Sequence, residues 1–368
     1  MSMIRFEWKK LFRSKVYYYF LGITILFIIG LFVRNYYYQD IIASERIEHF
    51  KHHSSTISSQ LITDQKSIEE MGDHPDPHLV ETYEAGLALH TKLRELITSL
   101  ENNKKLDALQ IENRVYELAL HYQSLDGHYP MSRVDMENEM KLNNYLLEKV
   151  LPKENLSSSI QIAVFMKQVS QYALSSFVIL ILLIIIGTPI LKEFDDQTIK
   201  LTYVLPVSSN QMIIFKWVSA CLAGISWLIV IFATSFTVAK LFSRTEENVF
   251  DYPFFTGEMD LIPASDYFQQ VMLVSIFYLF MVLALFIFLS FSIKNSYIAY
   301  IVLSLLFIGN YIVLQGGLIH SWLPWNYQEM DLLILQTETF PWVAFMGMIS
   351  VTILWLIGSI LISKRRGY

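Results

Sequence analysis

The sequence predicts an all-α, polytopic membrane protein with six transmembrane helices and a helical-hairpin domain outside the membrane. Of its 368 residues, 53% are hydrophobic and only 17% are charged, whereas soluble proteins carry about a quarter charged residues. Six long stretches without a charged side chain approach the roughly 20 apolar residues that a bilayer core requires. The single cysteine, Cys221, excludes an intrachain disulfide, and the net charge of -6 offers no basic surface for nucleic acid.

The boundaries of the spans follow from where charged residues interrupt the apolar stretches. The uncharged stretch 295–328 is too long for one span and is broken by Gly317 and Pro324. No predicted span has an ionisable side chain in its interior, which disfavours an ion-coupled carrier. The most polar midspan residue is Asn310, for which a hydrogen bond to a neighbouring helix is favoured over a substrate contact. The predicted spans are residues 16–34, 168–191, 217–239, 267–293, 297–314 and 340–363.

The distribution of basic residues predicts that both termini are cytoplasmic. Five basic residues lie in residues 1–15, three in the connection 192–216 and three in the tail 364–368. The short loops 240–266 and 315–339 on the opposite side hold few, as the positive-inside rule expects of external loops. No small-residue cleavage site follows the first span, so we expect a true span rather than a signal peptide.

Residues 35–165 form a polar insertion that this topology assigns to the extracytoplasmic side. The insertion holds 21 acidic and 12 basic residues, a net charge of -9. Apolar residues such as Phe50, Ile57 and Leu61 recur at heptad spacing, which predicts four amphipathic helices packed as antiparallel hairpins. Breaks between them are expected at residues 72–77, 102–103, 126–130 and 152–159.

Eight of the nine histidines lie in this insertion. His49 and His53 are one helical turn apart, and His74 and His78 flank two aspartates and two prolines. Such groups are typical of a metal site or of a sensor of external pH. Paired histidines at helical spacing are also common on solvent-facing helix surfaces, and the sequence favours this second interpretation. We therefore predict no bound metal.

The chain contains none of the common catalytic motifs. It has no Gly-x-x-x-x-Gly-Lys-Ser/Thr loop for ATP, no His-Glu-x-x-His, no Gly-x-Ser-x-Gly and no Cys-x-x-Cys. The sequence thus predicts a chain that is not an enzyme and holds no cofactor of its own. A many-spanning protein without an energy source points to a partner that supplies one.

The N-terminal segment 1–15 alternates apolar and basic residues, which predicts an amphipathic helix at the membrane interface. Aromatic side chains would enter the acyl boundary, while the cations face anionic headgroups. The residues that carry this prediction are Glu7, Trp8, Lys9, Lys10, Phe12 and Arg13.

The cytoplasmic connection 192–216 is too apolar for a solvated linker and predicts a short docking helix. Asp195 and Asp196 before Thr198 suit a helix N-terminus, and Pro206 suits its end. The alternative is a loop that packs against the chain's own spans. The predicted docking residues are Glu193, Asp195, Asp196, Thr198, Ile199, Leu201, Leu205 and Pro206.

Taken together, these segments resemble the membrane subunit of type-2 ABC transporter permeases. Gln197 stands where that family usually has Gly, and Ser209 where it has Arg. Leu323-Pro324 fits the short re-entrant helices that the family has in the loop before its last span, here 315–339. The resemblance covers both ends and all six spans but not residues 35–165. The matching residues are Glu193, Thr198, Leu201, Leu205, Pro206, Val207, Ser208 and Lys216, together with the N-terminal segment from Glu7 to Lys15.

The resemblance implies the permease subunit of an ABC exporter in a bacterial cell membrane. It implies a separate cytoplasmic ATPase that binds ATP and Mg, a second permease subunit, identical or related, and contact with membrane lipid. The N-terminal segment would be the family's connecting helix and the docking element its coupling helix. Substrates in this class are amphipathic, such as peptides or lipid-like molecules. The alternative function is ATPase-driven mechanotransmission or signalling to an envelope partner through residues 35–165, without transport.

Overall fold

The structure is a computed structural model that describes residues 2–13, 15–72, 74–199, 208–242, 248–257, 259–293, 295–317, 320, 322–336 and 342–365. These residues are mainly helical. A two-stranded sheet of β1 (Pro253–Phe255) and β2 (Leu261–Pro263) and two short 3-10 helices, η1 (Val249–Asp251) and η2 (Pro324–Gln328), are the exceptions among them. The chain divides into two compact units. The membrane unit comprises Met1–Phe32, Phe165–Phe242 and Phe255–Tyr368, and the hairpin unit comprises Val33–Val164 and Ser243–Phe254.

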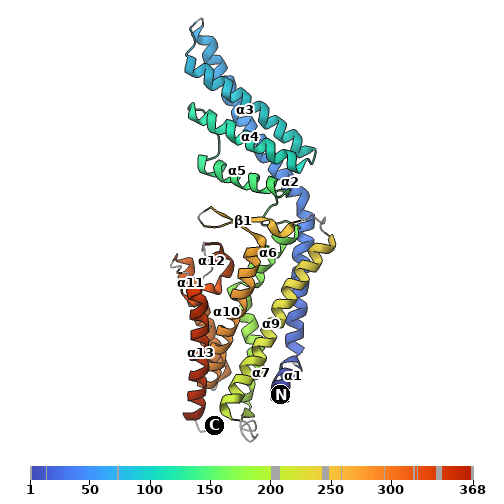
Figure 1. Cartoon of the computed structure of the whole chain (residues 1–368), viewed down its shortest axis with the longest axis vertical. Helices are drawn as coiled ribbons and strands as arrows, with labels where there is room; N and C mark the ends of the chain where they lie inside the picture. The colour runs from blue at the N-terminus through green and yellow to red at the C-terminus, as the bar shows by residue number, and fades with distance from the viewer. Residues whose placement is uncertain are drawn as a thin grey trace. The chain divides into compact units, whose positions relative to one another are not determined.

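Six helices are long and apolar enough to cross a membrane. Shorter helices are α1 (Ser2–Arg13), α6 (Ile162–Ala173) and α12 (Met330–Gln336). The prediction of an all-α chain with six spans is thus confirmed. In the membrane unit, α1 and the C-terminal end of α13 lie at the same end (Figure 1). The six long helices are α2 (Lys15–Met71), α7 (Ser176–Asp195), α9 (Ser209–Phe242), α10 (Ala264–Ser292), α11 (Ser296–Gln315) and α13 (Trp342–Arg365).

Helix α10 is the most buried of the six and packs against α7, α9 and α13 (Figure 1). Its close approach to α7 depends on Gly187, because a Cβ at this position would overlap the ring of Phe286. A similar approach joins α13 to η2, where a Cβ on Gly347 would meet the Pro324 ring at 2.7 Å. Small residues let helices approach closely in membranes, where packing rather than water exclusion drives association.

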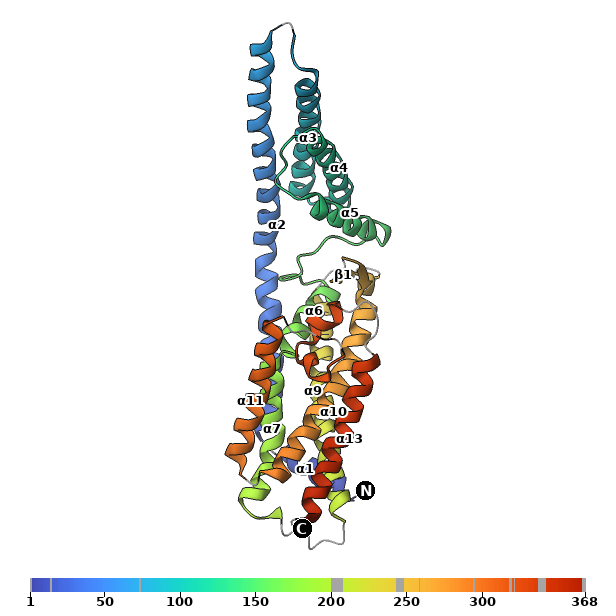
Figure 2. The ribbon, with the colours of Figure 1, turned by 90° about the vertical axis from the view of Figure 1, so that its left-hand side faces the viewer.

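Helix α2 is unbroken over 57 residues, from the first span far into residues 35–165 (Figure 2). The charged and polar residues after Arg34 end the apolar stretch but not the helix, since they contain neither Pro nor Gly until Gly72. Two groups of exposed tyrosines, at residues 18–19 and 36–38, lie about 18 residues or 27 Å apart along the axis. Tyrosines prefer membrane interfaces, and this spacing matches a bilayer core of about 30 Å.

The predicted second span, residues 168–191, is divided in the structure. Helix α6 ends at Ala173 and α7 begins at Ser176, with Ser175 in an extended conformation between them. Residues 170–178, around the break, contain neither Pro nor Gly, so the break has no local signal of that kind. Its cause is long-range: the carboxylate of Glu329 accepts hydrogen bonds from the backbone N–H and the hydroxyl of Ser176.

The hairpin unit packs the second half of α2 with α3 (Pro77–Glu101), α4 (Lys105–Ser124) and α5 (Arg133–Glu148). The predicted seam residues Phe50, Ile57 and Leu61 of α2 are all buried in its core. From the other helices the core takes Leu89, Leu93, Leu96, Ala108, Val115, Tyr116, Ala119, Tyr122 and Met136. The four-helix prediction agrees with this arrangement, and the first of the four helices is the continuation of α2.

Candidate functional site

A cluster of four charged side chains, which we call the basal cluster, joins α1, α7 and α9 in the membrane unit. Glu7, Glu193 and Lys216 are each at most 6% exposed. The Lys216 ammonium donates to Glu7 Oε1 at 2.9 Å and to Glu193 Oε2 at 2.6 Å. Lys10 forms an ion pair with the other oxygen of Glu193. Two acids thus balance two bases, which avoids an uncompensated buried charge.

Each member of the basal cluster is placed by simple helix geometry. Glu7 and Lys10 are three residues apart and share one face of α1, which packs against α9. Phe6, on another face, is 59% exposed, as an interfacial helix requires. Glu193 lies two residues before the end of α7, and Lys216 lies in the second turn of α9. The cluster therefore spans the connection 192–216, which links these two helices.

The charge state of Lys10 is sensitive to this environment. Burial, together with the neighbouring Lys216, lowers the pKa of Lys10 to about 8, and Glu7 acts in the opposite direction. The ammonium is therefore mostly charged at neutral pH and has lost about half of its protonated population near pH 8. The ion pair with Glu193 weakens as that proton leaves.

The start of the connection differs from the sequence interpretation. Asp195 is the last residue of α7 rather than the start of a docking helix, and its carboxylate accepts hydrogen bonds from the backbone N–H and hydroxyl of Ser296. Asp196 caps α7, and Thr198 is exposed. The following residue, Ile199, is buried.

Gln197 has a φ of 55°, a left-handed conformation that glycine adopts without strain. This explains physically why a glycine suits the position that Gln197 occupies. The chain turns sharply here, directly after α7. The turn separates α7 from the rest of the predicted docking element.

Several predicted residues lie outside the part of the chain that the structure describes. Leu201, Leu205 and Pro206 are among them, as are the side chains of Phe12 and Arg13. Of the remaining interfacial residues, Lys9 is exposed and Trp8 is 36% exposed. Their predicted roles stay predictions.

The four histidine candidates do not form one group, although the rings of His49 and His53 lie next to each other with their centroids 4.2 Å apart. His53 is buried in the hairpin unit, where its Nδ1 lies 3.0 Å from the Tyr129 hydroxyl. Burial, followed by the neighbouring His49 and His52, lowers the pKa of His53 to about 4. His74 and His78 are exposed near the start of α3. Within the described residues no three His, Cys, Asp or Glu side chains are grouped so that they could hold a metal ion.

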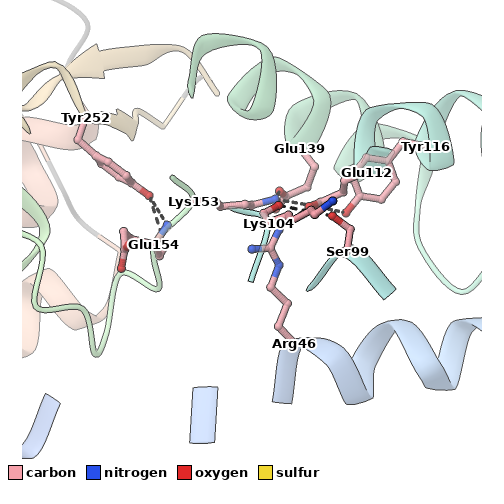
Figure 3. A network of polar contacts seen from close by, with 9 residues as sticks. All are labelled: Arg46, Ser99, Lys104, Glu112, Tyr116, Glu139, Lys153, Glu154 and Tyr252. Atoms are coloured by element: carbon pink, nitrogen blue, oxygen red, sulfur yellow. Dashed lines mark hydrogen bonds and ion pairs between the residues drawn. The ribbon is translucent and has the colours of Figure 1, made fainter. Parts of the chain in front are cut away.

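A second buried ionic network lies within the hairpin unit (Figure 3). Glu112 of α4 is 1% exposed and pairs with Arg46 of α2 and with Lys153, which follows α5. Tyr116 donates a hydrogen bond to the same carboxylate at 3.0 Å, and Lys153 also contacts Glu139 of α5. Burial raises the pKa of Glu112, but Lys153 and Arg46 outweigh burial and lower it to about 2.

Sequence reasoning missed this network and a set of acids at the far end of α7. Glu112 and Glu139 look like ordinary solvated helix residues, because their cationic partners are distant in sequence. Glu329 and Asp331 are two of the three acids in the connection 315–339, which has no Lys or Arg, and this lack of nearby cations was the available signal. The Asn310 amide donates hydrogen bonds to the Trp325 carbonyl and the Gln328 side chain, so it binds the short 3-10 helix η2 rather than another span.

The family model described as "ABC-2 family transporter protein" matches residues 1–336, which include the basal cluster, the connection 192–216 and residues 35–165. No match was found among curated proteins or among solved structures. The matched family consists of membrane transport subunits that normally work with an ATPase subunit. Because the match covers most of its length, the chain belongs to the ABC-2 transporter family.

Proposed function

We propose that the chain is the permease subunit of an ABC exporter, powered by a separate ATPase that binds ATP and Mg. Two permease subunits, identical or related, form the pathway in a bacterial plasma membrane. Both termini and the connection 192–216 face the cytoplasm, and residues 35–165 lie outside. Family membership, six apolar spans and the absence of catalytic motifs in the sequence support this assignment.

The observation that carries the proposal is the basal cluster. Three residues singled out for their motif positions, Glu7, Glu193 and Lys216, come from three distant segments and meet in one buried ionic contact. Lys216 stands at the end of the connection 192–216 and Glu193 at its start. A force applied to the connection by a docked ATPase therefore reaches α1, α7 and α9 together. Such an arrangement suits a coupling site better than a loop packed on its own spans.

The proposed substrate is amphipathic, with a peptide as the first choice. The net charge of -9 over residues 35–165 favours attraction of a cationic molecule. Lipid-like substrates fit the same pathway, because lateral access from the bilayer needs no charged groups within the spans. Direct transport assays with purified complex would separate these classes.

The test is purification of the tagged chain from its native membrane, with quantification of the ATPase that accompanies it. We expect a stoichiometric ATPase for the unaltered chain. Thr198→Arg should reduce the recovered ATPase by about tenfold, because a charged side chain enters the docking contact. Thr91→Arg is the matched control, since Thr91 is also exposed but lies on α3 of the hairpin unit. Its ATPase recovery should equal that of the unaltered chain.

Two results would contradict the proposal. A preparation of the unaltered chain without any ATPase would remove the basis for a permease function. Full ATPase recovery with Thr198→Arg would leave the permease function standing but would move the docking contact away from residues 195–207.

Mechanotransmission is the second candidate, and one specific observation favours it. Helix α2 is continuous from the first span into the hairpin unit, where Arg46 anchors it to Glu112. Lys153 ties the same carboxylate to the segment that returns toward α6. A rigid element of this kind could transmit movement of the first span to an envelope partner without any transport.

A further inference from the structure

Helices α7 and α11 lie side by side (Figure 2), and α7 has a carboxylate–serine contact at each end, one to α11 and one to Glu329, which lies beyond α11 in the chain. At one end, Asp195 of α7 accepts hydrogen bonds from the backbone N–H of Ser296, at 3.3 Å, and from its hydroxyl. At the other end, Glu329 accepts hydrogen bonds from the backbone N–H of Ser176, at 3.4 Å, and from its hydroxyl. Each serine is the first residue of its helix.

These contacts have a clear physical basis. The first N–H groups of a helix have no partner within the helix, and the helix dipole favours a negative charge near them. Ser175, which precedes α7, forms no capping hydrogen bond with its own side chain. The carboxylate of Glu329 therefore takes over the capping of α7. We call the Asp195–Ser296 and Glu329–Ser176 contacts the two clamps.

Glu329 lies in a segment, residues 324–336, that bridges several helices; we call it the strap. On one side, Asn310 of α11 donates to the side chain of Gln328 at 2.8 Å, and Gln328 donates to the carbonyl of Phe307 at 2.9 Å. On the other side, the Tyr267 hydroxyl of α10 donates to Asp331 at 2.5 Å. The strap is thus fixed to α11, α10 and, through Glu329, to α7.

The two clamps lie a full membrane thickness apart. From Ser176 to Asp195 the axis of α7 rises about 29 Å, close to the thickness of a bilayer core. Between them, the hydroxyls of Thr188 and Tyr300 lie 2.9 Å apart and link the same two helices. The clamp at Asp195 and Glu193 of the basal cluster lie within the same last turn of α7. The helix pair therefore connects the basal cluster to the strap.

We propose that α7 and α11 move as one clamped pair that carries displacement from the ATPase-docking end to the strap, and that Glu329 is the positioning residue that fixes the strap to this pair. The inference rests on the proposed permease function, since it needs an ATPase that displaces the docking end. With the clamp closed, the strap contributes Glu329 and Asp331 to the lining of a small pocket that Ser170, Gln171 and Tyr267 also line. Movement of the pair opens that pocket.

The experiment uses the full chain in its complex and reports access to this pocket. Cys221 is replaced by Ala, and Ser170, which is 2% exposed, is replaced by Cys as the sole reactive thiol. The rate of labelling by a membrane-impermeant maleimide is measured with and without ATP and Mg. We expect slow labelling at rest and labelling at least several-fold faster with ATP.

Variants at the two clamps should affect the resting labelling rate and its increase with ATP differently. Glu329→Gln should label at rest as fast as the parent does with ATP and should gain nothing from ATP, and Glu329→Asp should restore part of the response. Ser296→Ala loosens the other clamp, so its resting rate should stay slow while its ATP response falls to less than about half of the parent's. Asp266→Asn, which removes an exposed carboxylate from the first turn of α10, is the matched control and should behave as the parent.

Two outcomes would overturn the inference: a resting rate in Glu329→Gln equal to that of the parent, or an undiminished ATP response in Ser296→Ala. If Glu329→Gln, which removes the charge of the clamp, does not accumulate, Ser176→Ala removes its side-chain hydrogen bond from the opposite partner and carries the same expectation. The resting rates do not require an ATPase. Faster resting labelling in Glu329→Gln without any co-purified ATPase would therefore reject the permease function while leaving the clamp intact.

Discussion

At the scale of single residues, Lys216 and Glu112 illustrate how a buried charge holds distant segments together. Each is nearly inaccessible and each contacts two oppositely charged side chains. Loss of one partner from such a group leaves an uncompensated buried charge, at a cost of about 3–5 kcal/mol. Replacing the whole group by apolar residues costs far less. These contacts therefore fix which segments meet more than they raise the total stability.

His53 makes the hairpin unit sensitive to acid. Its pKa, about 4 in the folded chain, lies below the value near 6.5 of an unfolded histidine, so the unfolded chain binds more protons between these values. The stabilisation that unprotonated His53 contributes is thus almost fully present above pH 6.5, and it is lost as the pH drops toward 4. His53→Gln keeps a hydrogen-bonding group opposite Tyr129 but does not titrate. We expect this variant to reduce the loss of stability between pH 7 and 4.5 by about 1–2 kcal/mol.

Hydrogen exchange of peptides from α2 to α5 in the full chain, corrected for the intrinsic effect of pH, measures this difference. His121→Gln is the matched control, because His121 is an exposed histidine of α4 in the same unit. It should behave as the unaltered chain. Equal acid sensitivity in the His53→Gln variant and the unaltered chain would show that other groups, such as Glu112, account for all of it.

Some of these residues could be recognised from the sequence and others could not. Glu193 and Lys216 stand at fixed positions around the apolar connection 192–216, and Glu7 lies in an amphipathic segment, so pattern and resemblance singled them out. Their mutual contact could not be derived, because it depends on how α1 packs against α9. Glu112 carries no pattern at all. Its burial follows from Arg46 and Lys153, which are 66 and 41 residues away in the sequence.

At the scale of helices, the close contact between α7 and α10 depends on one position. Gly187→Ala introduces a Cβ that overlaps the Phe286 ring, so the two helices must separate or the ring must leave its rotamer. Overpacking of this kind costs about 1–3 kcal/mol. Gly30→Ala in α2 is the matched control, since no atom lies within 4 Å of the added Cβ. Alanine is the better helix former, so this change should be neutral or stabilising by up to about 1 kcal/mol.

Thermal unfolding followed by tryptophan fluorescence measures this effect in the membrane unit, because all seven tryptophans lie outside residues 33–164 and 243–254. We expect a lower midpoint for the Gly187→Ala variant and partial recovery on adding Phe286→Leu. An unchanged midpoint would mean that the Phe286 ring moves aside freely.

Some helix boundaries can be predicted from the local sequence, and others depend on residues that are distant in the sequence. The six spans follow from charge-free stretches, because a bilayer core excludes charged side chains whatever the tertiary structure. The break between α6 and α7 was not predictable, since its capping carboxylate, Glu329, lies 153 residues away. The sequence around Asp195 predicts the start of a helix, yet Asp195 is the last residue of α7 and accepts a hydrogen bond from Ser296. A local sequence signal cannot distinguish an acid that caps its own helix from one that caps a neighbour.

At the scale of the whole molecule, transport and mechanotransmission make different demands on α2. Mechanotransmission needs an unbroken helix between the first span and the hairpin unit, whereas transport needs only the six spans and their connections. Ala43 is an exposed position of α2 between the exposed tyrosines and the first core residue of the hairpin unit, Phe50. Proline in a helix interior costs about 3 kcal/mol and kinks or breaks the helix. Ala43→Pro therefore interrupts α2 without touching either core.

If the chain transmits movement to an envelope partner, ATP should change hydrogen exchange in the hairpin unit of the unaltered complex, and Ala43→Pro should abolish that change. The ATP-dependent change in the membrane unit should persist, because the basal cluster and both clamps lie there. Ala43→Lys, which keeps the helix, is the control and should preserve both changes. If transport alone is the function, reconstituted complex carrying Ala43→Pro should export its substrate at the unaltered rate. A loss of export would mean that the rigid extension of α2 is itself part of the transport cycle.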